Sequence, residues 1–296
     1  MLNVSKASDV RMLLGQLGIR PDRNLGQNFL VDDNVRQLIV SLAQVQPGER
    51  LLEIGPGLGV LTEGLLRAGG EVIAIEKDAR LAAFLADRHS HDQRLAIVNA
   101  DALAVDMTAI LAGADASCAG RLAPRPVDRV IANLPYSVGS RILMEIFIAR
   151  CRPQAVVVTV QKEVADRLAA PPGSSQYGLL SVWGQRVFDI WIDRSVHPRC
   201  FWPVPEVTSA IVVMHGTTAH ELDRPAERFF RDITRLAFSH RRKQMKAILS
   251  RWPELRDKGD VGELLAGASV VGTARPESLT VEDWCRLALC LAGYSR

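Results

Sequence analysis

The sequence predicts an α/β protein with a mostly parallel, Rossmann-like sheet whose last pair of strands is antiparallel, and a small all-helical C-terminal domain. Three observations support this fold class. Short apolar runs typical of buried strands alternate with segments of helical periodicity. The last two strand-like runs are joined by a proline-rich loop in place of a helix, which favours an antiparallel hairpin. Beyond Gly216 only short amphipathic helical patterns follow.

The N-terminal part of the chain contains two helical patterns separated by a polar loop. Apolar residues at helical spacing within 1–21 are closed by Gly18 and Pro21, and the loop follows at 23–30. Asp32 and Asp33 then lie where a helix N-cap belongs, ahead of further apolar residues at helical spacing. We therefore expect one helix on each side of the loop.

The apolar runs give the expected strands of the sheet. Those typical of parallel strands are 51–54, 72–75, 95–98, 130–132 and 155–160. Helical patterns lie between them at 61–66, 79–86 and 141–150, with a loop rich in Gly, Ala and Pro at 113–126. The expected antiparallel pair is 187–192 with 210–214. Ligands of open α/β sheets bind outside the carboxyl ends of the parallel strands, so the candidate site belongs at that edge.

Length and charge indicate two domains and a polyanionic partner. A chain of 296 residues is long enough for two domains, and a linker-like Gly-Thr-Thr begins at 216, so we expect a sheet domain at 1–216 and a helical domain at 217–296. The net charge is only +3, but residues 224–256 hold ten Lys/Arg and three Asp/Glu. One basic block on a mildly acidic body favours a polyanion as partner.

Composition disfavours several other classes of protein. The five cysteines are odd in number and scattered, with no Cys-x-x-Cys pair and no Cys/His cluster of zinc spacing, so we expect reduced thiols and no structural metal. The N-terminus has no apolar segment of signal-peptide length, and no apolar run approaches the ~20 residues that span a bilayer. We therefore expect a cytoplasmic protein without a membrane partner.

The segment Asn133-Leu134-Pro135-Tyr136 is the main candidate for chemistry, because it follows an apolar run at the expected edge. The amine of a nucleobase is a poor nucleophile, since its lone pair is delocalised into the ring. The Asn133 side-chain oxygen and the Leu134 carbonyl could accept its two hydrogens and localise that lone pair. Pro135 would hold the carbonyl, and Tyr136 would stack on the base. The alternative is an ordinary Asn-X-Pro turn with a packed tyrosine, which four residues alone favour.

The glycine-rich turn at 55–59 indicates a cofactor site at the same edge. Position 60 is Val, so the dinucleotide fingerprint G-x-G-x-x-G fails at its third glycine, which disfavours a Rossmann dehydrogenase. A cofactor without a pyrophosphate, such as S-adenosylmethionine, needs only the close backbone approach that glycine permits. Glu76 and Asp101, at the tips of the next two strands, could accept from ribose hydroxyls and from an adenine amine. For either acid alone, a solvated loop carboxylate is the alternative.

The basic block predicts a surface that binds phosphates. If 226–249 is one helix, five of its cations lie near one face, although Ser239 is a candidate cap for a second helix that would break this register. The candidate RNA-binding residues are Arg241, Arg242, Lys243 and Lys246. The alternative is a solvated helix face, which is the usual explanation of such a pattern.

Together these motifs resemble those of the rRNA adenine dimethyltransferases, and they occur in that family's order over most of the chain. The matching segments are Leu25–Leu30, Glu53–Gly59, Glu76, Asp101, Asn133–Tyr136, Gln161–Leu168, Phe201–Ser209 and Phe238–Lys243. Within the family the chain is most similar to the KsgA/RsmA group of small-subunit (16S) rRNA enzymes. It departs from the family in Leu25, where an aromatic is usual, in having only Arg23 as a basic residue just before it, and in a long loop at 113–126.

The resemblance implies a class I methyltransferase sheet at 1–216, with S-adenosyl-L-methionine as cofactor, and an rRNA-binding domain at 217–296. Glu76 would take the ribose, Asp101 the cofactor adenine, and the segment around Asn28 would close over the methionine end. The residues assigned to the cofactor are Asn28, Leu30, Gly55, Gly57, Glu76, Asp101 and Asn133.

For the substrate, the resemblance implies that residues 133–136 receive the target adenine and that Phe201 offers it a second aromatic face. The implied reaction is dimethylation of the exocyclic amine of two adjacent adenosines near the 3′ end of small-subunit rRNA. The implied partners are this rRNA and the immature small ribosomal subunit, and we expect a monomer. A methyltransferase-like fold kept as an RNA-binding assembly factor is the open alternative.

Overall fold

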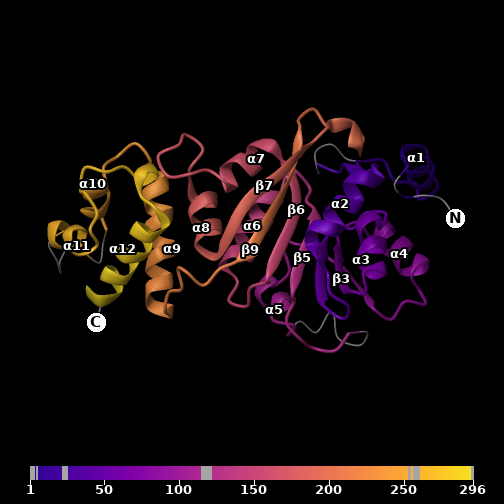
Figure 1. Cartoon of the computed structure of the whole chain (residues 1–296), viewed down its shortest axis with the longest axis horizontal. Helices are drawn as coiled ribbons and strands as arrows, with labels where there is room; N and C mark the ends of the chain where they lie inside the picture. Colours follow the sequence, from indigo (N-terminus) through magenta and orange to yellow (C-terminus); the bar gives the residue numbers. More distant parts are fainter. Residues whose placement is uncertain are drawn as a thin grey trace. The chain divides into compact units, whose positions relative to one another are not determined.

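The computed structural model describes residues 4, 6–21, 26–114, 122–252, 255 and 261–294. Arg23, Leu25 and residues 115–121 of the loop at 113–126 lie outside these residues. The chain forms two compact units (Figure 1): Met1–Ala165 with Ile190–Gly216, and Asp166–Asp189 with Thr217–Arg296. Within the described part of the chain, no helix has the length and apolar character needed to cross a membrane.

The first unit is built on a seven-stranded sheet with the spatial order β4-β3-β2-β5-β6-β9-β7. Its strands are β2 (Arg50–Ile54), β3 (Glu71–Glu76), β4 (Leu95–Asn99), β5 (Arg129–Asn133), β6 (Ala155–Gln161), β7 (Phe188–Val196) and β9 (Ser209–Gly216). The strands from β4 to β6 pair in parallel, and β9 is antiparallel to β6. The mostly parallel sheet predicted from the alternating apolar runs is therefore confirmed.

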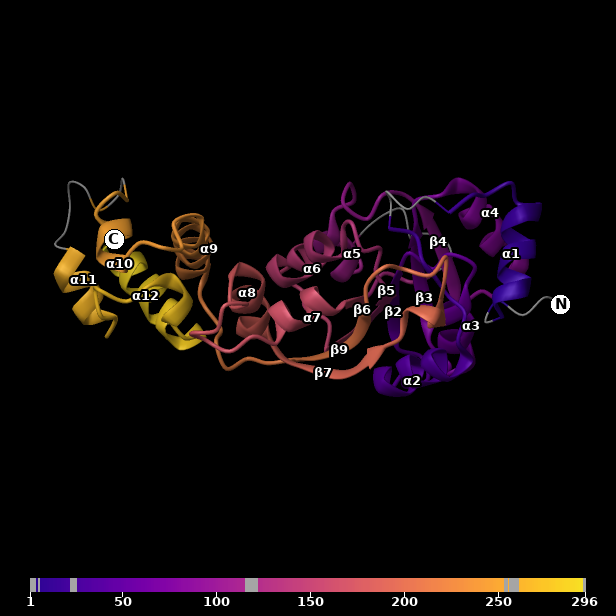
Figure 2. The same ribbon diagram turned by 90° about the horizontal axis from the view of Figure 1, so that it is seen from above.

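Helices cover both faces of this sheet, and Figure 2 shows α2 and α3 on one side of the strands and α5 and α6 on the other. They are α1 (Ala7–Gln16), α2 (Asp33–Ala43), α3 (Val60–Arg67), α4 (Ala79–Arg88), α5 (Met107–Leu111) and α6 (Gly139–Ile148). Because side chains alternate along a strand, Leu51, Ile131 and Val157 enter one apolar cluster, which includes Ile39 of α2 and Leu65 of α3. Burial on both faces explains why these strands are continuous apolar runs.

The loop before α2 contains a short strand that the sequence did not predict. This strand, β1 (Phe29–Leu30), pairs antiparallel with β8 (Phe201–Trp202) in a separate two-stranded sheet. After β1, Asp32 is the one of the two predicted candidates that caps α2, by accepting a hydrogen bond from the Val35 amide at 3.0 Å, and Asp33 is the first residue of the helix. The chain entering α2 is therefore fixed by backbone pairing as well as by the cap.

The second unit is helical. Its elements are α8 (Leu179–Val187), α9 (Arg224–Ser239), α10 (Met245–Leu249), α11 (Val261–Gly267), η4 (Pro276–Ser278) and α12 (Val281–Tyr294), while α7 (Lys162–Leu168) spans the boundary after Ala165. The units divide after Gly216, where a linker was expected, but residues 166–189, expected in the sheet domain, pack with the helical unit. The reason is visible at Trp183, whose buried indole donates a hydrogen bond to Thr234 Oγ1 of α9 at 2.9 Å.

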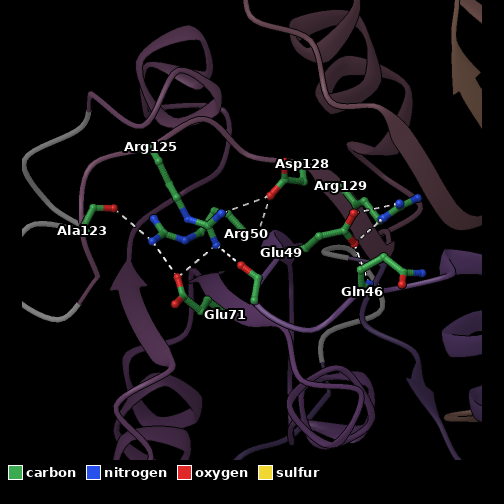
Figure 3. A network of polar contacts seen from close by, with 9 residues as sticks. Gln46, Glu49, Arg50, Glu71, Ala123, Arg125, Asp128 and Arg129 are labelled. Carbon is green, nitrogen blue, oxygen red and sulfur yellow. Dashed lines mark hydrogen bonds and ion pairs between the residues drawn. The ribbon is translucent and has the colours of Figure 1, made fainter.

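At the amino ends of the strands, a network of polar contacts holds the loop that enters β5 (Figure 3). The Arg50 side chain, 2% exposed, donates to Glu71 Oε2 at 2.9 Å and to the Ala123 carbonyl at 3.0 Å. Arg125 donates to the same Glu71 oxygen at 3.2 Å, and Asp128 accepts from the Arg50 amide at 2.7 Å. These contacts attach the loop to β2 and β3. They lie at the opposite edge of the sheet from the carboxyl ends of the strands, where the candidate site is found.

Candidate functional site

A cavity of about 340 Å³ lies at the carboxyl edge of the sheet. The turns after β2, β3, β4 and β5 line it, together with the segment before α2. The predicted site residues that it brings together are Asn28, Leu30, Gly55, Gly57, Glu76, Asp101, Asn133, Leu134, Pro135 and Tyr136. Segments that are far apart in the chain therefore meet at one edge, as the sequence predicted.

The glycine-rich turn after β2 needs glycine for its backbone conformation and for close packing. Gly55, Gly57 and Gly59 all have positive φ, of 68°, 59° and 85°. A Cβ on Gly57 would lie 3.1 Å from the ring of Phe29 in β1. The Gly57 amide donates to Glu76 Oε2 at 3.1 Å, so the turn is fastened to the tip of β3.

Glu76 and Asp101 hold their carboxylates at the tips of adjacent strands, in different electrostatic settings. Glu76 is 5% exposed and also accepts from the Asp78 amide at 2.9 Å, and burial raises its pKa. Asp101 is more open, and its hydrogen-bonded ion pair with Lys77 at 2.9 Å lowers its pKa. Carboxylate oxygens have several lone pairs, so both side chains retain capacity to accept hydrogen bonds from an adenosine.

Glu53 is a cavity residue to which sequence reasoning assigned no role. It is 1% exposed, accepts a hydrogen bond from Thr62 Oγ1 at 2.6 Å, and lines the cavity. Burial raises its pKa to about 8. The sequence feature that could have identified it is a glutamate within the apolar run 51–54. Burial of a carboxylate costs free energy unless the group is neutral or has a hydrogen-bond partner.

Among the described residues, one polar atom of the Asn133 side chain has a hydrogen-bond partner and the other has none. Its Nδ2 donates to the Asn28 carbonyl at 2.8 Å, while its Oδ1 is buried and has no hydrogen-bond partner among the described residues. A backbone carbonyl can only accept, so Nδ2 has to face Asn28 and Oδ1 has to be the remaining atom. A buried acceptor left unpaired in this way indicates a place for a ligand donor.

The three residues after Asn133 are held by contacts with three other segments. The Leu134 amide donates to the Thr159 carbonyl of β6 at 3.1 Å. A Cβ on Gly26 would lie 2.9 Å from the Tyr136 nitrogen, so the segment before β1 packs directly against this turn. The Tyr136 hydroxyl is hydrogen-bonded to Ser209 Oγ of β9, and burial raises its pKa. The turn is therefore rigidly placed at the rim of the cavity.

Phe201 does not take the position predicted for it. Its side chain is 1% exposed, belongs to the apolar core of the first unit, and is not among the residues that line the cavity. In the pairing of β1 with β8, Phe201 stands opposite the buried Leu30. Phe29 of β1 is the aromatic residue of this pair of strands that lines the cavity.

The predicted RNA-binding residues lie in the second unit and differ in their exposure and in their contacts. Arg242 and Lys246 are exposed, and Lys243 is half-buried. Arg241 forms an ion pair with Glu277 and donates to the Ser175 carbonyl at 2.7 Å. Its guanidinium therefore connects segments of the helical unit.

The single cationic face considered for 226–249 is absent. Helix α9 ends at Ser239 and α10 begins at Met245, so the cations before and after this break do not share one helical register. The cap considered at Ser239 does not form either, because Gln244 precedes α10 and the Ser239 hydroxyl donates to the Leu236 carbonyl.

Comparison with known proteins shows the family to which the chain belongs. The family model for ribosomal RNA adenine dimethylase matches residues 20–292. The chain is 38% identical over 280 residues to ribosomal RNA small subunit methyltransferase A of Moorella thermoacetica, covering 94% of this chain and 95% of that protein. It is 37% identical over 289 residues to the protein of the same name from Protochlamydia amoebophila, covering 96% of each.

Solved structures show the same fold. A dimethyladenosine transferase from Plasmodium falciparum superposes with a TM-score of 0.72 at 23% identity, covering 89% of this chain and 97% of that one. The 23S rRNA methyltransferase ErmE superposes with a TM-score of 0.64 at 27% identity, covering 89% of this chain and 99% of that one. With a family model and relatives that span nearly the whole chain, the protein belongs to the ribosomal RNA adenine dimethylase family.

Proposed function

We propose that the protein transfers methyl groups from S-adenosyl-L-methionine to the exocyclic amines of adenines in small-subunit rRNA. The observation that carries this proposal is the buried Oδ1 of Asn133 at the rim of the cavity, which has no hydrogen-bond partner in the described part of the chain. Membership of the family supports an rRNA adenine methyltransferase, and the relatives named as small-subunit enzymes support the small-subunit rRNA as substrate.

The cavity residues fit an adenosine-containing cofactor. Gly55 and Gly57 allow close approach of the backbone, and we assign Glu76 to the ribose hydroxyls and Asp101 to the adenine amine. The segment with Asn28 and Leu30 would cover the methionine end. When bound there, S-adenosyl-L-methionine supplies an electrophilic methyl group.

The turn at 133–136 provides what a poorly nucleophilic amine needs. Asn133 Oδ1 and the Leu134 carbonyl would each accept one amine hydrogen, which localises the nitrogen lone pair toward the methyl donor. Pro135 holds the carbonyl in place, and the Tyr136 ring would stack on a base taken out of its own stack. The amine loses its proton after attack, so orientation and exclusion of water are sufficient without a strong base.

For the substrate we propose two adjacent adenosines near the 3′ end of the small-subunit rRNA, presented by the immature small subunit. The sheet unit would carry cofactor binding and transfer. The helical unit, to which 166–189 belongs by packing, would bind rRNA through Arg242, Lys243 and Lys246. We propose a cytoplasmic monomer that acts with this partner.

The test is transfer of a labelled methyl group from the cofactor to small-subunit rRNA or to immature particles, followed by mapping of the modified bases. We expect label on the exocyclic amines of two neighbouring adenines. Binding without transfer would instead support the assembly-factor alternative.

Asn133→Ala is expected to lower transfer by on the order of a hundredfold or more, because the amine loses its side-chain acceptor. Cofactor affinity, measured by calorimetry, should stay near that of the wild type. Asn34→Ala is the matched control, since Asn34 is exposed in α2 and does not line the cavity. Equal loss of affinity and transfer in Asn133→Ala would mean that Asn133 holds the cofactor and not the amine.

A further inference from the structure

We infer that Ser209 is a positioning residue for methyl transfer, whose hydroxyl holds the Tyr136 ring in the orientation that receives the target base. The inference rests on the proposed function, because it requires Tyr136 to stack on that base. Ser209 belongs to a segment that resembles the family, but a serine at the start of a strand does not by itself indicate a role.

Ser209 is anchored in the sheet more firmly than a loop residue. It is the first residue of β9, is 0% exposed, and stands opposite Gln161 of β6 in an antiparallel ladder. Its backbone is therefore fixed by strand pairing. Its hydroxyl is hydrogen-bonded to the hydroxyl of Tyr136.

Tyr136 reaches Ser209 across the neighbouring strand. Tyr136 follows the end of β5, whereas Ser209 lies on β9, and β6 lies between them in the sheet. Two strand spacings correspond to roughly 10 Å, so a side chain that spans much of this gap must be extended across the rim. The ring is held at its backbone end by the packing of Gly26 and at its other end by Ser209.

This two-ended attachment matters because a stacking platform acts through its orientation. A tyrosine side chain has two rotatable bonds, and loss of the distal contact would let the ring tilt away from the base. Burial raises the pKa of Tyr136, so its hydroxyl remains protonated at neutral pH and keeps its bond to Ser209. Displacement of the base would misalign the amine relative to Asn133.

A double-mutant cycle tests the inference with Ser209→Ala, Tyr136→Phe and the double variant. Each single variant should lower single-turnover transfer about fivefold to tenfold, with cofactor affinity unchanged, because each removes the same hydrogen bond. The double variant should be no slower than either single variant, since the contact is already lost. Additive losses, or a Ser209→Ala enzyme as fast as the wild type, would overturn the inference.

Two controls separate this role from a structural one and from failure of the proposed function. Ser181→Ala removes a hydroxyl that is also 0% exposed and hydrogen-bonded, but lies in the helical unit, and it should leave transfer unchanged. With 2-aminopurine at the target position, Ser209→Ala should lose the stacking-dependent quenching of fluorescence seen with the wild type. If the wild type transfers no methyl group to rRNA, the proposed function fails. If the wild type is active and the cycle is additive, only the role of Ser209 fails.

Discussion

At the carboxyl edge of the sheet, two residues place buried polar atoms beside the cavity. Asn133 is half-buried, and its Oδ1 is buried without a hydrogen-bond partner among the described residues. Glu53 has a carboxyl group whose pKa burial raises to about 8. The location of Asn133 could be predicted, because a polar residue that ends an apolar run is directed to the sheet edge. The raised pKa of Glu53 could not, because the sequence does not show how deeply its carboxyl group is buried or that Thr62 donates to it.

Glu53 makes the stability of the folded protein depend on pH. Its pKa is about 8 in the folded protein and close to the ordinary 4.5 in the unfolded chain. Folding therefore favours the protonated form, so this contribution is complete below pH 4.5 and is lost as pH rises to about 8. The Glu53→Gln variant keeps an acceptor for Thr62 and never ionises. Across this window it should gain stability over the wild type by up to about 1.4 kcal/mol per pH unit.

Denaturant unfolding of both proteins without cofactor, at several pH values, measures this difference. Glu145→Gln makes the same substitution at an exposed position, and its stability should follow that of the wild type. A constant difference between Glu53→Gln and the wild type across the window would mean that Glu53 is ionised throughout.

Among the elements, the segment from Gly26 to β1 has the most consequence for the site. Its Asn28 carbonyl orients Asn133, and its Gly26 packs against the backbone of Tyr136. The sequence predicted the location of this segment over the cofactor only through family resemblance. A two-residue strand has no periodicity of its own, so neither β1 nor its pairing with β8 could be predicted.

Gly26→Ala should impair catalysis beyond its effect on stability. Gly26 has a φ of 64°, and the added Cβ would lie 2.9 Å from the Tyr136 nitrogen, so one of the two segments has to move. The left-handed conformation alone costs about 1–2 kcal/mol for a residue with a Cβ. We expect slower transfer per folded molecule, because displacement of Tyr136 and of the bond from Asn133 to Asn28 misaligns the residues proposed to receive the base.

Gly18→Ala separates these two effects. Gly18 also has a φ of 64°, but a Cβ there meets nothing within 4 Å. This variant should lose a similar amount of stability in thermal unfolding and retain transfer. If Gly26→Ala retained transfer equally well, the contact with Tyr136 would have no part in shaping the site.

On the scale of the whole molecule, charge is divided between residues that hold the fold and residues available to a ligand. The sequence predicted a basic block from a local excess of Lys and Arg alone. This excess does not distinguish cations that hold the fold from cations that are available to a ligand. The distinction depends on segments distant in sequence, since Glu277 and Ser175 reach Arg241 from two other parts of the helical unit. The exposed Arg242 and Lys246 have the accessibility that binding to a phosphate backbone requires.

Substitution of each cation should therefore separate rRNA affinity from stability. Arg242→Ala and Lys246→Ala should each weaken rRNA binding and reduce the slope of log affinity against log salt by about one, as expected for one lost phosphate contact. Arg241→Ala should leave that slope unchanged and lower the free energy of unfolding by about 1 kcal/mol, because its ion pair is partly exposed and screened. Filter-binding titrations over a range of salt concentrations, together with denaturant unfolding, measure both quantities. A reduced salt slope in Arg241→Ala, at unchanged stability, would mean that Arg241 binds rRNA.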